Sequence, residues 1–265
     1  MSRITADKNR CVKCGECIEV CPDKAIAFGQ DGFPEDVPES TCILCGHCEA
    51  VCASEALAHT ELPEDDHLLV GKELPSPALI DNLLMSRRSV REFNDLPLGR
   101  QVVEELLNVA RRAPTAVNSQ NVHWIVVEGK EKVFELSRET MKGAGPMMGT
   151  GDPHAASFLK RWESGYDIVL RGAPTVVVAC TPKDYGWGRE DSTIALTFLE
   201  VAAVARGLGA CWAGFLTRIA AVHEPLCRLL AVPEGYMVCG GLMLGKGKYS
   251  YHGIPPRKPL SVQWN

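Results

Sequence analysis

Eight of the twelve cysteines in the chain lie between residues 11 and 52, in two blocks of identical spacing. The segments CVKCGECIEVCP (residues 11–22) and CILCGHCEAVCA (residues 42–53) both follow the pattern C-x2-C-x2-C-x3-C, offset by 31 residues. A cubic [4Fe–4S] cluster needs four thiolates from different directions. A tight loop with this spacing supplies three of them, and the fourth cysteine of each block ligates the other cluster. The spacing therefore predicts two clusters, one held by Cys11, Cys14, Cys17 and Cys52 and the other by Cys42, Cys45, Cys48 and Cys21.

Zinc is the alternative metal, because four-cysteine zinc sites are common and a lone CxxC pair fits either metal. Two copies of a three-cysteine loop, each with a displaced fourth cysteine, do not have a zinc spacing, so we favour iron–sulfur clusters. Gly15 and Gly46 lie inside the loops, where a side chain would crowd a cluster and where backbone amides can donate to the sulfurs. A similar tail follows each block, DKAIAF or SEALAH. We expect each block to form a loop, a short helical turn and a short strand.

A second set of polar residues lies in the rest of the chain. Arginine gives forked, charge-assisted hydrogen bonds to phosphate, so SRRSVREF (residues 86–93) offers a phosphate site, the alternative being a solvated basic turn. Asn118 and Gln120 carry amides that could bind a ring edge or could merely cap a loop. GLGACWAGF (residues 207–215) has small residues that let backbone amides approach a flat ligand, or it is simply a helix end followed by a buried strand. PPRKPL (residues 255–260) places Arg257 and Lys258 in an extended tail.

Composition and charge divide the 265-residue chain and exclude several classes of protein. Residues 1–74 carry 6 Lys and Arg and 15 Asp and Glu, a net charge of −9, whereas residues 75–265 carry 22 and 18, a net charge of +4. The strongly basic face of a nucleic-acid-binding protein is absent, and no apolar run is long enough to span a membrane. The N-terminal residues contain no secretion signal, and so many free cysteines suit a reducing cytoplasm. We expect domains at residues 1–60 and 78–265, joined by an acidic, proline-containing linker at 61–77.

The second domain is predicted to alternate helices and strands. Helices are expected at 77–87, 99–113, 132–142, 154–170, 191–209 and 220–232, and strands at 123–129, 174–182 and 236–245. Asp191 or Ser192 is expected to cap the helix over 191–209, and Pro225 is expected to break the helix over 220–232. This order indicates an α+β or α/β layered domain, and no phosphate-binding glycine fingerprint appears in it. The loop GAGPMMGTGDPH (residues 143–154) is expected to lack regular structure and is either a lid on the substrate side or an ordinary surface loop.

Two resemblances follow from these motifs. Residues 5–60 resemble the bacterial two-cluster ferredoxins. RRSVREF, APTAVNSQ, DSTIALTFLEVAAVARGLGACWAGF and PPRKPL, in that order, resemble the nitroreductase family of FMN enzymes over residues 77–260. This family resemblance implies an α+β domain with a mostly antiparallel sheet, and a homodimer with FMN at the dimer interface. The whole chain is similar to the branch of that family that carries an N-terminal ferredoxin module.

The resemblance also implies which residues hold FMN. The phosphate and one edge of the ring would contact residues 86–93, here called the arginine segment. The ring or ribityl chain would contact residues 113–120, the amide loop. The flavin N5 would lie beside a backbone amide of residues 207–215, the glycine-rich turn. Relatives commonly have Gln-Pro-Trp where this chain has Gln120, Asn121 and Val122, and some carry an acidic residue where it has Ala213. The implied residues are Arg87, Arg88, Ser89, Arg91, Thr115, Asn118, Gln120, Trp212, Ala213, Gly214, Arg257 and Lys258.

The resulting hypothesis is an oxidoreductase that passes electrons between two [4Fe–4S] clusters and FMN and reduces a small organic acceptor, with nitroaromatic compounds as one candidate. No side chain is required as an acid or base, so no catalytic residue is predicted. The electron donor is NAD(P)H, or a ferredoxin or another redox protein. Two alternatives stay open: an electron-transfer module that docks a partner protein without small-molecule turnover, and a flavin-destroying or dehalogenating relative, because the fold does not fix the function.

Overall fold

The computed structural model describes residues 2–63, 66–148 and 153–265, and no side chain of residues 146–155 is discussed. The chain divides into two compact units, Met1–Leu74 together with Val117–Ser119, and Pro75–Ala116 together with Gln120–Asn265. Within the described residues, none of the helices is both long enough and apolar enough to cross a bilayer.

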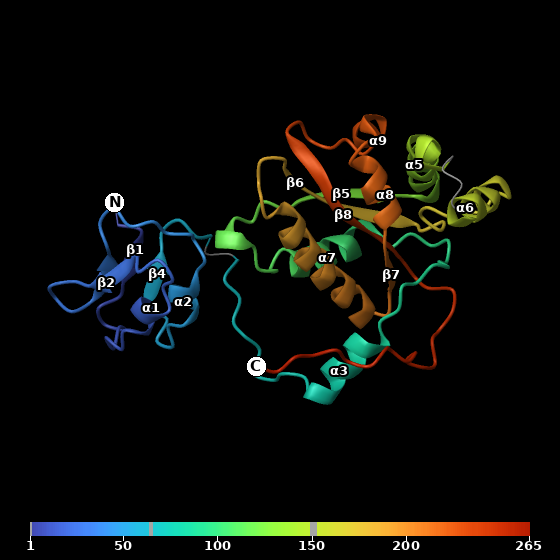
Figure 1. Ribbon diagram of the computed structural model, residues 1–265. Helices are drawn as coiled ribbons and strands as arrows, with labels where there is room; N and C mark the ends of the chain where they lie inside the picture. Colours follow the sequence, from blue (N-terminus) through green and yellow to red (C-terminus); the bar gives the residue numbers. More distant parts are fainter. Residues whose placement is uncertain (1, 64–65, 149–152) are drawn as a thin grey trace. The chain divides into compact units, whose positions relative to one another are not determined.

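The first unit is built from the internal repeat. Each copy contains a cysteine loop, a one-turn helix and a short strand, in the order expected from the sequence (Figure 1). The strands pair antiparallel as β1 with β4 and β2 with β3. Its elements are β1 (Ile4–Ala6), α1 (Glu16–Glu19), β2 (Ile26–Phe28), β3 (Pro34–Asp36), α2 (His47–Ala50) and β4 (Leu57–His59).

The core of the first unit is small and contains cysteine. Four buried residues, Ile4, Ile26, Cys48 and Leu57, form its centre. Three further cysteines, Cys17, Cys21 and Cys52, pack against that centre with partly buried side chains. So few apolar residues cannot bury the surface that a domain of this size needs, which is the situation in which metals commonly supply folding energy.

The second unit is a four-stranded antiparallel sheet of order β5-β6-β8-β7 with helices on both faces (Figure 1). Its helices are α3 (Pro77–Ser86), α4 (Arg100–Ala110), the single turn η2 (Ala116–Asn118, whose last residues group with the first unit), α5 (Lys130–Met148), α6 (Pro153–Glu163), α7 (Gly188–Ala205), α8 (Gly214–Ala220) and α9 (Glu224–Leu229). Its strands are β5 (His123–Glu128), β6 (Thr175–Pro182), β7 (Gly209–Trp212) and β8 (Tyr236–Gly245).

The continuous β-branched run in β6 explains the layering. Alternate residues of a strand point to opposite faces, and both faces of β6 are buried. Val177 and Ala179 join the core formed with α4 and α7, whereas Val176 and Val178 join the core formed with α5, α8 and α9. The expected α+β domain with an antiparallel sheet is confirmed.

Several helix ends differ from the predicted ones. Helix α5 runs to Met148, so residues 143–148 of the predicted loop are helical, and α6 begins at Pro153; residues 149–152 lie outside the described residues. Helix α6 stops at Glu163, short of the expected 170. Helix α7 begins at Gly188, before the expected cap at Asp191 or Ser192. Over 220–232, α8 ends at Ala220 and α9 spans Glu224–Leu229, so the interruption lies just before Pro225, which stands in the first turn of α9.

Candidate functional site

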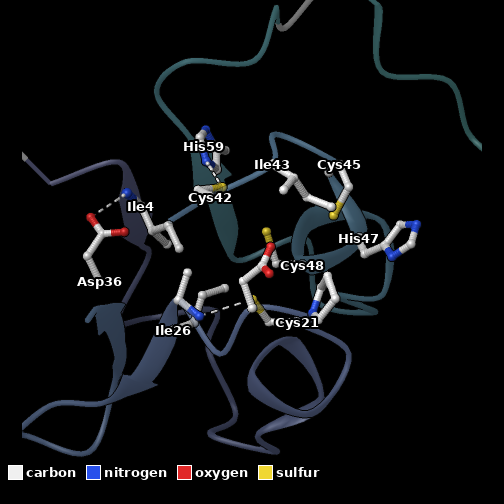
Figure 2. A pocket seen from close by; sticks show the side chains of 14 residues that line it. Ile4, Cys21, Ile26, Asp36, Cys42, Ile43, Cys45, His47, Cys48 and His59 are labelled. Atoms are coloured by element: carbon white, nitrogen blue, oxygen red, sulfur yellow. Dashed lines mark hydrogen bonds between the residues drawn. The ribbon is translucent and has the colours of Figure 1, made fainter. Parts of the chain in front are cut away.

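Two cavities lie in the first unit, and four cysteines line each of them. Each cavity takes three cysteines from one block and the last cysteine from the other. The first is lined by Cys11, Cys14, Cys17 and Cys52, and the second, drawn in Figure 2, by Cys42, Cys45, Cys48 and Cys21.

The backbone of the two loops has the same unusual conformation in both copies. Gly15 and Gly46 have φ of 83° and 70°, in the left-handed region that glycine adopts without strain. Lys13 and Leu44, which occupy equivalent places two residues earlier, have φ of 58° and 52°. These left-handed residues bend each loop tightly, and three closely spaced cysteines therefore reach the same cavity.

Backbone amides donate to the cysteine that crosses between the blocks. The Ala25 amide donates to the Cys21 sulfur at 3.2 Å, and the Ala56 amide donates to the Cys52 sulfur at the same distance. Hydrogen bonds to cluster sulfurs are one of the means by which a protein sets cluster potential. The crossing cysteines are thus held in the same way in both copies.

Burial and local contacts shift the pKa values of the cysteine thiols in different directions. Burial raises the pKa of Cys48 to about 11, and burial with the nearby Cys14 also raises the pKa of Cys17. For Cys52, burial acts upward, but hydrogen bonds from Ser54 and from backbone amides outweigh it and lower the pKa. The Ser54 hydroxyl lies 3.5 Å from the Cys52 sulfur.

All-sulfur donor sets suit zinc or iron–sulfur clusters, and the residues present fit a cluster in each cavity. The four cysteines that line each cavity, the loop glycines and the amides aimed at sulfur all match what a cubic cluster requires. Among the described residues, no three His, Cys, Asp or Glu side chains converge on a point where a single metal ion would bind.

In the second unit, the arginine segment lies against the end of the sheet. Ser89 forms a parallel bridge with Ala210 of β7, and the Val90 amide donates to the Ala210 carbonyl at 2.9 Å. Gly209 allows this approach, because a Cβ there would lie 2.8 Å from Val90. The segment therefore runs beside the turn that follows β7.

A buried carboxylate joins the arginine segment to that turn. Glu200 of α7 is 4% exposed and pairs with the Arg87 guanidinium at 2.9 Å. Its other oxygen lies 3.4 Å from the Trp212 indole nitrogen, which donates to it. Glu200 was missed from the sequence, although an acidic residue in the otherwise apolar last part of the helix, between Leu199 and Ala203, signals a partner.

The two other arginines of the segment face different surroundings. Arg88 donates to the carbonyls of Arg87 and Met85 at 2.7 and 2.6 Å, while its buried Nε has no hydrogen-bond partner within the described residues. Arg91 is exposed and donates to the Ser89 carbonyl at 3.4 Å. Charge and an unused buried donor at this segment fit an anionic group such as phosphate.

The amide loop has a backbone that only specific contacts can hold. Val117, Asn118 and Gln120 have φ of 48°, 52° and 52°, a region that is uncommon for residues other than glycine, above all a β-branched one. The Gln120 amide donates to the Thr115 hydroxyl at 3.0 Å. Within the first unit, the side-chain nitrogen of Asn118 donates to the carbonyls of Ile43 and Leu44 at 3.0 and 2.8 Å.

Asp191 fixes the start of this loop and was also missed from the sequence, where we assigned it as a helix cap. It is 3% exposed and accepts from the Ala116 amide at 3.1 Å and from the Tyr185 hydroxyl at 2.5 Å. Strained backbone held by buried partners is common at functional sites.

In the turn after β7, the structure shows which backbone amides are already hydrogen-bonded within the domain. The Ala213 amide donates to the Gly241 carbonyl at 2.8 Å, so it is engaged within the sheet domain. Gly214 begins α8, where first-turn amides have no partner within the helix, and a Cβ at Gly214 would meet no atom within 4 Å. Of the amides predicted to face a flavin, that of Gly214 fits best.

The C-terminal tail is not brought to this region by any contact among the described residues. Residues 250–265 are exposed and lack helix and strand. Arg257 and Lys258 make no hydrogen bond or ion pair with the described part of the chain. Their predicted role at a phosphate stays a prediction.

Comparison with known proteins agrees with these features. The model of the nitroreductase family matches residues 84–246, and that of a 4Fe-4S dicluster domain matches residues 3–53. A Cr(VI) reductase of Pseudomonas sp. (strain G-1) is 28% identical over 190 residues, which are 69% of this chain and 72% of that protein. A nitrobenzene nitroreductase of Ectopseudomonas oleovorans is 26% identical over 207 residues, 65% of this chain and 88% of that protein.

Solved structures share the fold of the second unit. A nitroreductase with bound FMN from Bacteroides fragilis superposes with a TM-score of 0.57 at 21% identity, and the match covers 71% of this chain and all of that one. The family model spans more than half of the chain, and it covers the arginine segment, Glu200 and the turn after β7. The chain therefore belongs to the nitroreductase family and carries, ahead of that domain, a 4Fe-4S dicluster domain.

Proposed function

We propose that the protein is an iron–sulfur flavoprotein that passes electrons between two [4Fe–4S] clusters and FMN and reduces a small organic acceptor. The observation that carries the proposal is the pair of four-cysteine cavities in the same chain as a nitroreductase-family domain. As an enzyme of that family, the protein is an FMN-dependent oxidoreductase. When bound, FMN exchanges one or two electrons and can supply a hydride equivalent to a substrate.

The FMN site that we propose lies where the arginine segment meets the turn after β7. Arg88 and Arg91, with Ser89, would bind the phosphate and one ring edge. Glu200 would orient Arg87 through its ion pair, leaving the remaining guanidinium nitrogens to face the ligand. The Gly214 amide would donate to the ring, with Trp212 and Ala213 beside it. Thr115, Asn118, Gln120, Arg257 and Lys258 would complete the site, the last two from the tail.

The surrounding assembly and donor are part of the same proposal. A homodimer would complete each site, as the family resemblance implies, in a reducing cytoplasm that preserves the thiolates. The donor would be NAD(P)H acting at the flavin, or a reduced ferredoxin acting through the clusters. The proposed acceptors include nitroaromatic compounds, because one relative that matches this chain is named a nitrobenzene nitroreductase.

An anaerobic absorbance titration of the purified protein tests the proposal. The starting spectrum should show flavin bands on a broad iron–sulfur shoulder, and NADH, NADPH and reduced ferredoxin would be added in separate experiments. Bleaching by a nicotinamide identifies a self-sufficient NAD(P)H enzyme, and bleaching by ferredoxin alone identifies the clusters as the entry point.

The variant Cys45→Ala provides a matched control, since it alters one cavity and leaves the second unit unchanged. If electrons enter through the clusters, bleaching of the flavin by ferredoxin should slow in this variant while any reaction with NADPH stays unchanged. A purified protein without flavin bands would contradict the proposal. A protein that binds FMN and a partner protein but turns over no small acceptor would favour the electron-transfer module instead.

A further inference from the structure

One difference between the two copies of the repeat lies at the end of the strand that follows each cysteine block. Residue 59 ends β4 and residue 28 ends β2, and they are separated by the same 31 residues as the cysteine blocks. His59 stands in the second copy, and Phe28 stands in the first. Both residues end strands of equal length, so the backbone places them alike, while only one of them carries polar atoms.

His59 is buried against a predicted ligand of the second cluster. The residue is 4% exposed, and its Nε2 lies 3.5 Å from the Cys42 sulfur, as the dashed line in Figure 2 marks. The His59 amide donates to a carboxylate oxygen of Glu49 at 2.7 Å, which fixes the end of the strand. The strand end that carries the imidazole is therefore fixed, with the ring beside the sulfur.

The other ring nitrogen determines which tautomer is present. The Glu61 amide donates to His59 Nδ1 at 3.2 Å, so Nδ1 acts as an acceptor and carries no proton. A neutral imidazole then has its proton on Nε2, the atom that faces Cys42. The bond is thus an N–H donated to sulfur.

Phe28 makes no comparable contact in the first copy. Its ring is half exposed and covers the first loop, where a Cβ on Gly15 would lie 3.3 Å from the ring. Phenylalanine has no donor, so the cysteine loop of the first cavity receives no hydrogen bond from this position.

We propose that His59 is a positioning residue that raises the reduction potential of the second cluster by donating its Nε2–H to the Cys42 thiolate. Reduction adds one electron, supplied by a low-potential one-electron donor, and its negative charge is shared between the metal core and the thiolates. A donated N–H stabilises this more negative state more than the oxidised state, which raises the potential. No proton is transferred. The inference rests on the proposed binding of clusters and on no property of the flavin.

The experiment compares three variants of the full-length chain, purified anaerobically with their clusters. His59→Leu removes the donor at similar volume, His59→Gln restores an amide donor, and Phe28→Leu makes the matched change at the equivalent position. Iron and sulfide content are measured first, and each cluster's potential is then followed by electron paramagnetic resonance during a redox titration. Histidine labelled with ¹⁵N adds a test for magnetic coupling between the reduced cluster and the imidazole.

We expect His59→Leu to lower the reduction equilibrium constant of one cluster about tenfold, which is about 59 mV for a one-electron couple, and to leave the other unchanged. His59→Gln should recover at least half of that change, and Phe28→Leu should change neither cluster. The ¹⁵N coupling should be present in the wild type and absent from His59→Leu.

Unchanged potentials in His59→Leu, or equal shifts in both clusters, would overturn the proposal. If His59→Leu does not retain both clusters, His59→Gln decides: a fully loaded protein with a wild-type potential supports the donor role, and failure to load shows a role in assembly only. A wild-type protein that contains no iron and sulfide would contradict the proposed function itself. Bound clusters that are insensitive to His59 would contradict only this inference.

Discussion

The crossing of one cysteine from each block to the other cavity can be tested with pairs of substitutions. Cys21 belongs to the first block in sequence, but it lines the same cavity as Cys42, Cys45 and Cys48. Replacing Cys21 with alanine should therefore damage the second cluster and spare the first, although three cysteines adjacent in sequence serve the first.

The magnitude follows from the two separate sets of four sulfurs. Cys21→Ala and Cys45→Ala each affect the same cluster, so the double variant should keep about half of the wild-type iron and sulfide, like either single variant. Cys14→Ala with Cys21→Ala removes a ligand from each cavity, and this pair should lose the intact signals of both clusters. Additivity is expected only where the two changes affect independent sites.

The assay is iron and sulfide content together with electron paramagnetic resonance of the reduced, anaerobic protein. Cys239→Ala is the control, because Cys239 lies in the second unit and contacts Thr181 there. If Cys14→Ala with Cys21→Ala keeps one intact cluster while Cys21→Ala with Cys45→Ala keeps none, each block holds its own cluster and the crossed arrangement is refuted.

Three further predictions concern stability and assembly. Arg87→Met should destabilise the second unit by about 2–4 kcal/mol, because it leaves the buried Glu200 carboxylate without its cation. Glu200→Gln should cost less stability. Thermal unfolding measures both variants, and equal losses of stability would contradict this account. Removing iron with a chelator should make the first unit sensitive to protease and leave a resistant fragment of the second unit, because the core of the first unit depends on cysteine. Protease resistance of both units after complete loss of iron would contradict this prediction. Reconstitution of the clusters with iron and sulfide should release protons and should be faster at pH 9 than at pH 7. The pKa of Cys48 is raised to about 11, so this thiol is protonated at neutral pH, whereas the metal binds the thiolate. A reconstitution rate that does not depend on pH would show that deprotonation is not limiting.

The first unit was largely predictable from the sequence because cluster ligation restricts spacing. Four sulfurs around one centre leave few arrangements of a short loop, so the loop, turn and strand of each copy followed from the cysteine pattern. His59 could have been noticed by aligning the segments that follow the two cysteine blocks, because it is polar where the equivalent residue of the first copy, Phe28, is apolar. Its contact with Cys42 could not be foreseen, because side-chain direction depends on the fold.

The second unit was harder to predict where small residues have a packing role. Gly143, Gly145 and Pro146 suggested a loop, yet α5 continues through them. A Cβ at Gly143 would lie 2.5 Å from the His223 ring, so glycine is needed there for close packing of α5 on the segment after α8. Local propensity indicated a break, and tertiary packing overrode it. Glu200 and Asp191 were missed for a related reason, because Arg87, which pairs with Glu200, and Ala116, which donates to Asp191, are far from them in sequence.

The central position of β8 has a consequence for how the protein is made. This strand pairs with both β6 and β7, so the sheet of the second unit cannot be completed until residue 245 has been synthesised. The cysteine loops and strands of the first unit end at His59, and ribosomes add about 5–20 residues per second, so the last strand of the sheet follows roughly 10–40 s later. We expect the cysteine loops to be available to the cell's iron–sulfur delivery system during this interval, so that the clusters are inserted before the flavin domain has folded.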